Sequence, residues 1–161
     1  MFPTRKFPRM PKSLLKKPKG FRTPRVEDFK ADMQRLGQDI AEEFKQRVID
    51  NIENNEYGFI LSESTMRHKH SMTPLIETHE MVDAIFREGT TVSVEDTPRE
   101  DSQLTNLELA MVHEYGTKDK HIPARPVWRN TFRDFKEDAK DMIDDFLETK
   151  KFKGDGRDNR S

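Results

Sequence analysis

The sequence contains no cysteine in its 161 residues. This absence excludes a disulfide scaffold, a thiolate zinc site, an iron–sulfur cluster and a cysteine nucleophile. No apolar run approaches the roughly 20 residues that a membrane-spanning helix needs. The basic N-terminus lacks the apolar segment of a secretory signal, so we expect the chain to be made and used in the cytosol.

Apolar residues are also scarce. Hydrophobic residues make up 32% of the chain and charged residues 37%. Only 35 residues are Leu, Ile, Val or Phe, close to the level of about 20% below which highly charged chains tend not to fold. We therefore expect one domain with a thin core, tails that do not belong to it, and further stabilising burial against neighbouring copies.

The charge is unevenly distributed along the chain. Residues 1–25 hold nine basic side chains and no acidic one, whereas the other 136 residues have a net charge of −10. The nine cations are Arg5, Lys6, Arg9, Lys12, Lys16, Lys17, Lys19, Arg22 and Arg25. Five prolines deny this segment a continuous helix, so we expect an extended basic arm. Such an arm suits a nucleic-acid backbone or the acidic surface of a neighbouring subunit; we favour the subunit because the body is acidic.

Two long amphipathic helices are predicted. Apolar residues recur every three or four positions from Val26 to Ile52, which predicts one helix with Thr23 as its N-cap and Pro24 at its first position. Gly37 inside this helix predicts a close packing contact. A second helix is predicted to open at Pro126, with an apolar stripe and an opposite acidic face. That face contains Asp134, Glu137, Asp138, Asp141, Asp144 and Asp145.

The segment between these helices predicts smaller elements. Residues 81–86 predict a short helix or the start of a strand, and alternation over 90–95 predicts a half-buried strand. Thr105 and Glu108 form a capping box for a helix that ends at Gly116, where a left-handed residue is expected. We predict the α+β class, with two long helices and a shorter one packed on a small antiparallel sheet. The expected divisions are the arm at 1–25, the domain at 26–148 and a flexible tail at 149–161.

No arrangement of residues predicts catalysis. Neither His79-Glu80 nor His113-Glu114 is followed by the second histidine of a His-Glu-x-x-His zinc motif. The sequence has no Gly-x-Ser-x-Gly elbow and no glycine-rich phosphate loop. We therefore expect no enzymatic activity, no cofactor and no metal. The alternative at this point is a metal-dependent hydrolase whose site is built from histidines distant in sequence.

The most informative segment is 113–128, which predicts a helix end, a loop and a rigid extended strut. Arg125 is restricted by prolines on both sides, and Glu114 ends the preceding helix. We expect an ion pair between Arg125 and Glu114, which we favour slightly as a contact across a subunit boundary; the alternative is that both face solvent.

This segment resembles a known family. The stretches His113–Thr117 and Ile122–Trp128 look like the signature of tailed-bacteriophage neck and tail-completion proteins, also called virion-morphogenesis or minor tail components. Two upstream stretches are similar to other family segments: Leu61-Ser62 with Thr65 and Lys69, and Thr73–Met81. The resemblance covers residues 57–132. His79 stands where the family has glycine, which disfavours a left-handed turn there, and residues 96–104 form a longer, more charged segment than in the family.

The resemblance implies a structural role without catalysis. Members form an oligomeric ring that joins the DNA-filled head to the tail, through long helices packed on a small antiparallel sheet. The implied partners are copies of the chain in a ring, the head–tail connector, the tail terminator or tube, and genome DNA in the lumen, without a membrane. The implied location is the virion neck or tail, reached from the host cytoplasm. The expected structural and interface residues are Glu114, Gly116, Ile122, Pro123, Arg125, Pro126 and Trp128. The alternative function is a nucleic-acid-binding module that acts through the basic arm.

Overall fold

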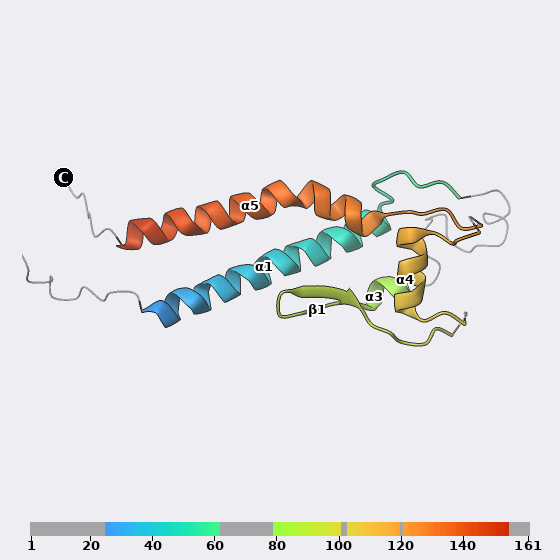
Figure 1. Ribbon diagram of the computed structural model, residues 1–161, viewed down its shortest axis with the longest axis horizontal. Helices are drawn as coiled ribbons and strands as arrows, with labels where there is room; N and C mark the ends of the chain where they lie inside the picture. The colour runs from blue at the N-terminus through green and yellow to red at the C-terminus, as the bar shows by residue number, and fades with distance from the viewer. Residues whose placement is uncertain (1–24, 62–78, 101–102, 120, 155–161) are drawn as a thin grey trace, which may run out of the picture.

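The computed structural model describes residues 25–61, 79–100, 103–119 and 121–154. The long helices are α1 (Val26–Glu53) and α5 (Val127–Gly154), and the short ones are α3 (Glu80–Asp83) and α4 (Asn106–Tyr115). Strands β1 (Ile85–Glu88) and β2 (Thr91–Val94) pair in an antiparallel hairpin. Figure 1 shows α1 and α5 side by side in opposite directions, with the hairpin, α3 and α4 toward one end of the pair. The α+β prediction is confirmed.

Aromatic side chains join α1 to α5. Phe44 of α1 lies among Trp128, Phe132 and Phe135 of α5, with ring centroids 6.2, 6.2 and 5.9 Å away. Tilted and edge-to-face rings at this separation pack favourably. Farther along the pair, Phe29 contacts Phe146 at 6.0 Å. The predicted apolar stripes of the two helices therefore face each other.

The β-hairpin packs on the middle of α1. Its register pairs Ile85 with Val94 and Glu88 with Thr91, and Gly89 takes a positive φ of 59° in the turn. A Cβ added to Gly37 of α1 would lie 2.9 Å from Thr90 Cγ2. The close contact predicted at Gly37 is thus confirmed, and its partner is the hairpin turn.

The main core lies where α1, the hairpin, α3, α4 and the start of α5 meet. Val48 and Ile52 of α1 are almost completely buried at its centre. The other buried members of this cluster are Met81, Val82, Ala84, Ile85, Val94, Ala110 and Val127. This core is as thin as the composition predicted, because the outer halves of α1 and α5 contribute few buried side chains to it.

Several predicted boundaries need correction. Helix α1 begins at Val26 with Arg25 as its N-cap residue, and the expected cap Thr23 and Pro24 lie outside the described residues. Helix α5 begins at Val127, one residue after Pro126, and it continues to Gly154. The tail predicted to begin at residue 149 is therefore helical for its first six residues, because no glycine or proline interrupts the helix before Gly154.

The structure also corrects the expectation at His79. This residue precedes α3 with φ 56° and ψ −12°, the left-handed conformation that histidine was expected to disfavour. The turn is therefore made without glycine, at the energetic cost that a Cβ brings in this region.

Candidate assembly surface at the junction of helices α4 and α5

The carboxylate of Glu114 caps the start of α5. Glu114 is a buried residue in the last turn of α4, and it accepts hydrogen bonds from the backbone N–H groups of Trp128 and Arg129 at 3.0 and 3.2 Å. These N–H groups belong to the first turn of a helix, which has no internal acceptors for them and attracts negative charge. The side chain of one helix thus fixes where the next helix begins.

Arg129 completes this contact. Its Nε donates to Glu114 Oε1 at 2.9 Å, and its Nη2 donates to the Glu114 carbonyl oxygen at 3.0 Å. The guanidinium carbon also lies 5.3 Å from the centre of the Tyr115 ring. The ion pair joins a buried carboxylate to a largely exposed arginine, whose side chain is 59% exposed.

The expected ion pair between Arg125 and Glu114 is therefore wrong within the single chain. Among the residues that the structure describes, the Arg125 side chain makes no hydrogen bond or ion pair, and the residue is buried. Burial lowers the pKa of the Arg125 guanidinium from its ordinary value. Its backbone N–H donates to the His113 carbonyl at 2.6 Å, so the strut is held to α4 by its main chain.

Gly116 makes the sharp turn between α4 and this strut. Its φ of 73° and ψ of −179° lie in a region that is essentially restricted to glycine. The φ is positive, as for the left-handed residue expected here, but the ψ is extended rather than helical. An added Cβ would lie 2.8 Å from both Ala124 N and Ile122 O. Position 116 thus requires glycine both for its backbone conformation and for space.

The loop after Gly116 closes on itself. Thr117 N–H donates to the Ile122 carbonyl, and Ile122 N–H donates to Thr117 Oγ1, both at 3.0 Å. Pro123 is exposed, Pro126 is half-buried, and Trp128 is half-buried against Phe44. The predicted motif residues therefore build one rigid corner.

An apolar groove of about 420 Å³ lies beside this corner, between β2, α4 and the first turns of α5. Met111, Tyr115 and Phe132 line it and are 53%, 65% and 62% exposed. Val92, Leu107 and Trp128 form deeper parts of its wall. Large apolar side chains gathered in one open groove are typical of a surface that binds another protein. Helical periodicity shows that Met111 and Phe132 lie on apolar sides of their helices, but it does not distinguish a core position from an open groove, so their exposure is not predicted from the sequence.

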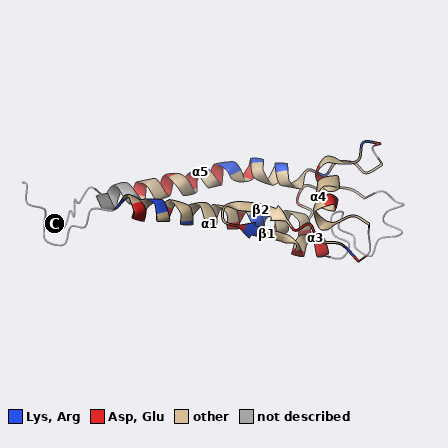
Figure 2. Cartoon of the chain, turned by 60° about the horizontal axis from the view of Figure 1, so that its bottom comes forward, with Lys and Arg blue, Asp and Glu red and all other residues tan. Residues whose placement is uncertain are grey.

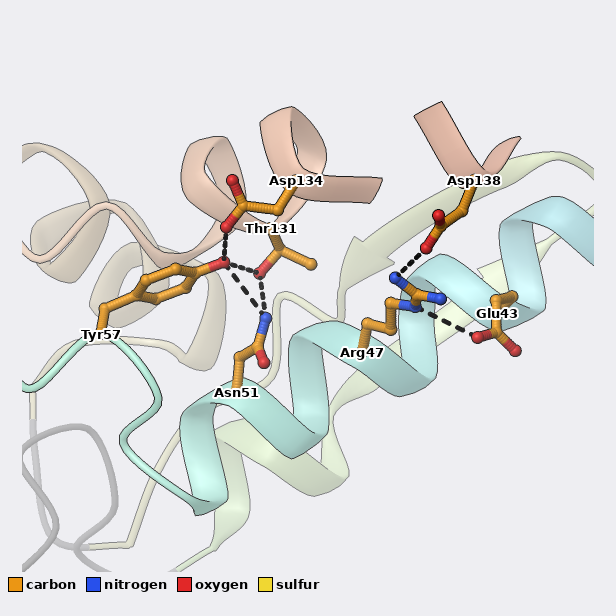
Figure 3. Close-up of polar contacts among 7 residues, drawn as sticks. All are labelled: Glu43, Arg47, Asn51, Tyr57, Thr131, Asp134 and Asp138. Carbon is orange, nitrogen blue, oxygen red and sulfur yellow. Dashed lines mark hydrogen bonds and ion pairs between the residues drawn. The ribbon is translucent and has the colours of Figure 1, made fainter. Parts of the chain in front are cut away.

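A polar network ties the other side of α5 to α1 (Figure 3). Asn51 Nδ2 donates to the buried Thr131 Oγ1 at 2.8 Å, and the Tyr57 hydroxyl lies 3.1 Å from Asp134 Oδ2. Desolvation, together with the nearby Asp134 carboxylate, raises the pKa of Tyr57 above its ordinary value. These contacts fix the helix pair at the end that bears the corner and the groove.

One ion pair continues this connection along the helix pair. Arg47 of α1 contacts Asp138 of α5 at 2.6 Å and Glu43 at 3.1 Å. Burial by itself lowers the Arg47 pKa, but the hydrogen bonds to Asp138 and Glu43 outweigh it, so that the pKa is raised overall. Two residues of the predicted acidic face thus make contacts within the chain: Asp138 holds α5 to α1, and Asp134 contacts Tyr57, just after α1.

The remaining predicted sites fall mostly outside the described residues. Of the basic arm, only Arg25 is described; it is exposed, and its backbone N–H contacts Asp28 Oδ2 at 3.3 Å. Ser62, Thr65, Lys69 and positions 73–78 of the upstream family-like segments also lie outside the described residues. Within the described ranges, no three His, Asp or Glu side chains gather as a metal site. No described helix is long and apolar enough to cross a membrane.

Comparisons with family models, with curated proteins and with solved structures gave no match to this chain.

Proposed function

We propose that this chain is a structural subunit of the head–tail junction of a tailed bacteriophage. Copies assemble into a neck or tail-completion ring that joins the DNA-filled head to the tail, and no catalytic chemistry is assigned to them. The proposal begins from the resemblance of residues 57–132 to that family. Its second support is a surface of the structure, the apolar groove beside the 113–128 segment.

One observation carries the proposal. The segment with the most specific resemblance, residues 113–128, forms a corner whose geometry is fixed by Glu114 and Gly116. This corner stands beside the groove in which Met111, Tyr115 and Phe132 are exposed. A rigid corner beside an open apolar groove suits a subunit that repeats one contact around a ring, since a closed ring needs the same angle at every interface. The thin core agrees with a chain that completes its burial by assembly.

The direct test measures assembly of the full chain. We expect sedimentation velocity and negative-stain electron microscopy to show a closed ring with a central channel. Replacing the groove residues in Met111→Gln/Phe132→Gln should abolish the ring. It should lower the free energy of unfolding by only about 1–2 kcal/mol, because both side chains are largely exposed and Phe132 loses its ring contact with Phe44. Ile60→Gln is the matched control, since Ile60 is 84% exposed outside the groove. Rings that persist in the groove variant contradict this surface.

The virion role needs a second assay. Purified protein should restore joining of heads and tails in an extract of the phage that lacks this gene, and the groove variant should not. A chain that stays monomeric at every concentration and restores no joining contradicts the proposal. The nucleic-acid alternative is favoured by the nine cations of the arm. It predicts DNA binding by the monomer that weakens steeply with salt.

A further inference from the structure

The outer face of α5 carries a stripe of negative charge, in which Lys140 is the only basic residue between positions 137 and 148. Its members follow one another at four, three, one and three positions, which places them within one side of a helix. The stripe consists of Glu137, Asp141, Asp144, Asp145 and Glu148, all exposed. Among the described residues, none of these five side chains takes part in an ion pair. We call this set the α5 acidic stripe.

The stripe lies on the side of α5 that no described element covers. The neighbouring positions Phe135 and Phe146 face α1 through their ring contacts, and the acidic positions alternate with them on the opposite side of the helix. Figure 2 shows the α5 ribbon coloured red at its acidic residues, chiefly in its C-terminal half. Five like charges within about three turns repel one another. A cationic partner would relieve this repulsion, whereas a second copy of the same stripe would increase it.

We propose that the basic arm, residues 1–24, of one copy docks on the α5 acidic stripe of a neighbouring copy. The inference rests on the proposed function, because it requires neighbouring copies in an assembly. The arm has eight cations and no acid before Arg25. It is thus the complementary segment that the chain itself supplies.

The spacing of the charges fits. The stripe runs from residue 137 to residue 148, which is about 16 Å along a helix axis. A proline-rich extended chain covers that length with about five or six residues, at roughly 3.1 Å each. The segment 16–22 contains four cations, namely Lys16, Lys17, Lys19 and Arg22. An extended arm can therefore place most of these cations along the stripe at once.

The entry into α1 favours a neighbouring copy over the arm's own α5. Because α1 and α5 are antiparallel, an arm lying on its own stripe must reverse direction just before α1. Arg25 is extended, with φ −76° and ψ 151°. Pro24 fixes its own φ near −65° and restricts Thr23 to extended geometry. Three successive residues with these preferences disfavour a tight reversal directly before α1, which favours docking on a neighbouring copy.

Photo-cross-linking of the full chain tests this inference. A benzophenone amino acid is placed at Phe21, and isotopically heavy and light copies are mixed before assembly. We expect cross-links between heavy and light copies that map to residues 134–149. Raising the salt from about 0.05 M to about 0.5 M should reduce them severalfold, because these exposed charges are screened.

Charge reversal supplies the matched control. Asp141→Lys/Asp144→Lys should reduce the cross-link yield about tenfold, whereas Glu95→Lys/Glu100→Lys, with the same change in charge at exposed sites away from α5, should leave it within about twofold. Circular dichroism checks that both variants fold. Cross-links confined to single copies, or equal loss in both variants, overturn the inference. If rings form but either of these results is obtained, only the docking inference fails. If no ring forms in any sample, the proposed function fails as well.

Discussion

Glu114 Oε1 lies 2.9 Å from Arg129 Nε, and the same carboxylate accepts the first free N–H groups of α5. The contact joins the last turn of α4 to the first turn of α5. It therefore fixes the direction in which a helix of 28 residues leaves the core. The wall of the apolar groove depends on the same junction, because Tyr115 and Trp128 are the residues that adjoin this pair in sequence.

Removing the carboxylate should weaken the fold strongly. We expect Glu114→Ala to lower the free energy of unfolding by about 2 kcal/mol, since it leaves two partly buried N–H groups and a guanidinium without their acceptor. Urea denaturation followed by circular dichroism measures the change. A double-mutant cycle of Glu114→Gln with Arg129→Gln should show coupling of about 1 kcal/mol. The same cycle with Arg125→Gln should be additive in the isolated subunit, and coupling of equal size there contradicts the assignment of the partner.

Position 116 should not tolerate a side chain. Gly116→Ala should cost at least about 2 kcal/mol, because the backbone conformation is strained and the new Cβ meets two backbone atoms at 2.8 Å. Gly58→Ala is the matched control: Gly58 also has a positive φ, of 61°, but no atom of the described residues lies within 4 Å of its Cβ position. It should cost only about 1 kcal/mol. Equal losses in the two variants contradict the steric part of the argument.

Replacing His79 by glycine should stabilise the fold. We expect His79→Gly to raise the free energy of unfolding by about 0.5–1 kcal/mol, since relief of the left-handed conformation outweighs the greater freedom of glycine in the unfolded chain. The comparison is Asn55→Gly, at the other described non-glycine residue with positive φ, 48°. Asn55 exchanges two 3.0 Å hydrogen bonds with the Phe59 backbone. That substitution should therefore give no gain, and a loss of stability in His79→Gly contradicts the prediction.

Tyr57 should make stability fall at high pH. Its pKa is raised in the folded state, so the unfolded chain releases the phenolic proton first. The stability that the protonated Tyr57 contributes is fully present below the ordinary tyrosine pKa near 10. It is lost as the pH rises from there through the pKa of the folded state. Denaturation measured between about pH 8 and pH 11 should show this decline in excess of that of Tyr57→Phe. The variant itself should cost about 1 kcal/mol at neutral pH, through loss of the hydroxyl contacts. Parallel pH profiles of the two proteins contradict the role of Tyr57.

Local and periodic features of the sequence predicted most of the elements. The spacing of apolar residues identified α1 and α5, and the capping box at Thr105 is formed with Glu108 N–H donating at 3.2 Å. Gly116 was expected to end α4, and it does. These predictions succeed because helix periodicity, caps and glycine conformations depend on residues within a turn of each other. The extent of α5 was predicted too short, because its apolar stripe ends at Leu147, whereas no glycine or proline interrupts the chain before Gly154.

The partners of the charged residues were decided only by the tertiary structure. The sequence predicted that Glu114 pairs with a cation of the following segment. Two candidates, Arg125 and Arg129, lie four residues apart on either side of the start of α5. Which of them meets the carboxylate depends on where α5 begins and on the angle at which it leaves α4. The same holds for Asp138, whose partner Arg47 is 91 positions earlier in the chain. The sequence determined which segments are helical and where charge accumulates, because these are short-range or compositional properties. The structure alone decided which apolar residues remain at the surface, because packing of α5 against α1 and α4 buries one side of its apolar stripe and leaves Phe132 in the groove.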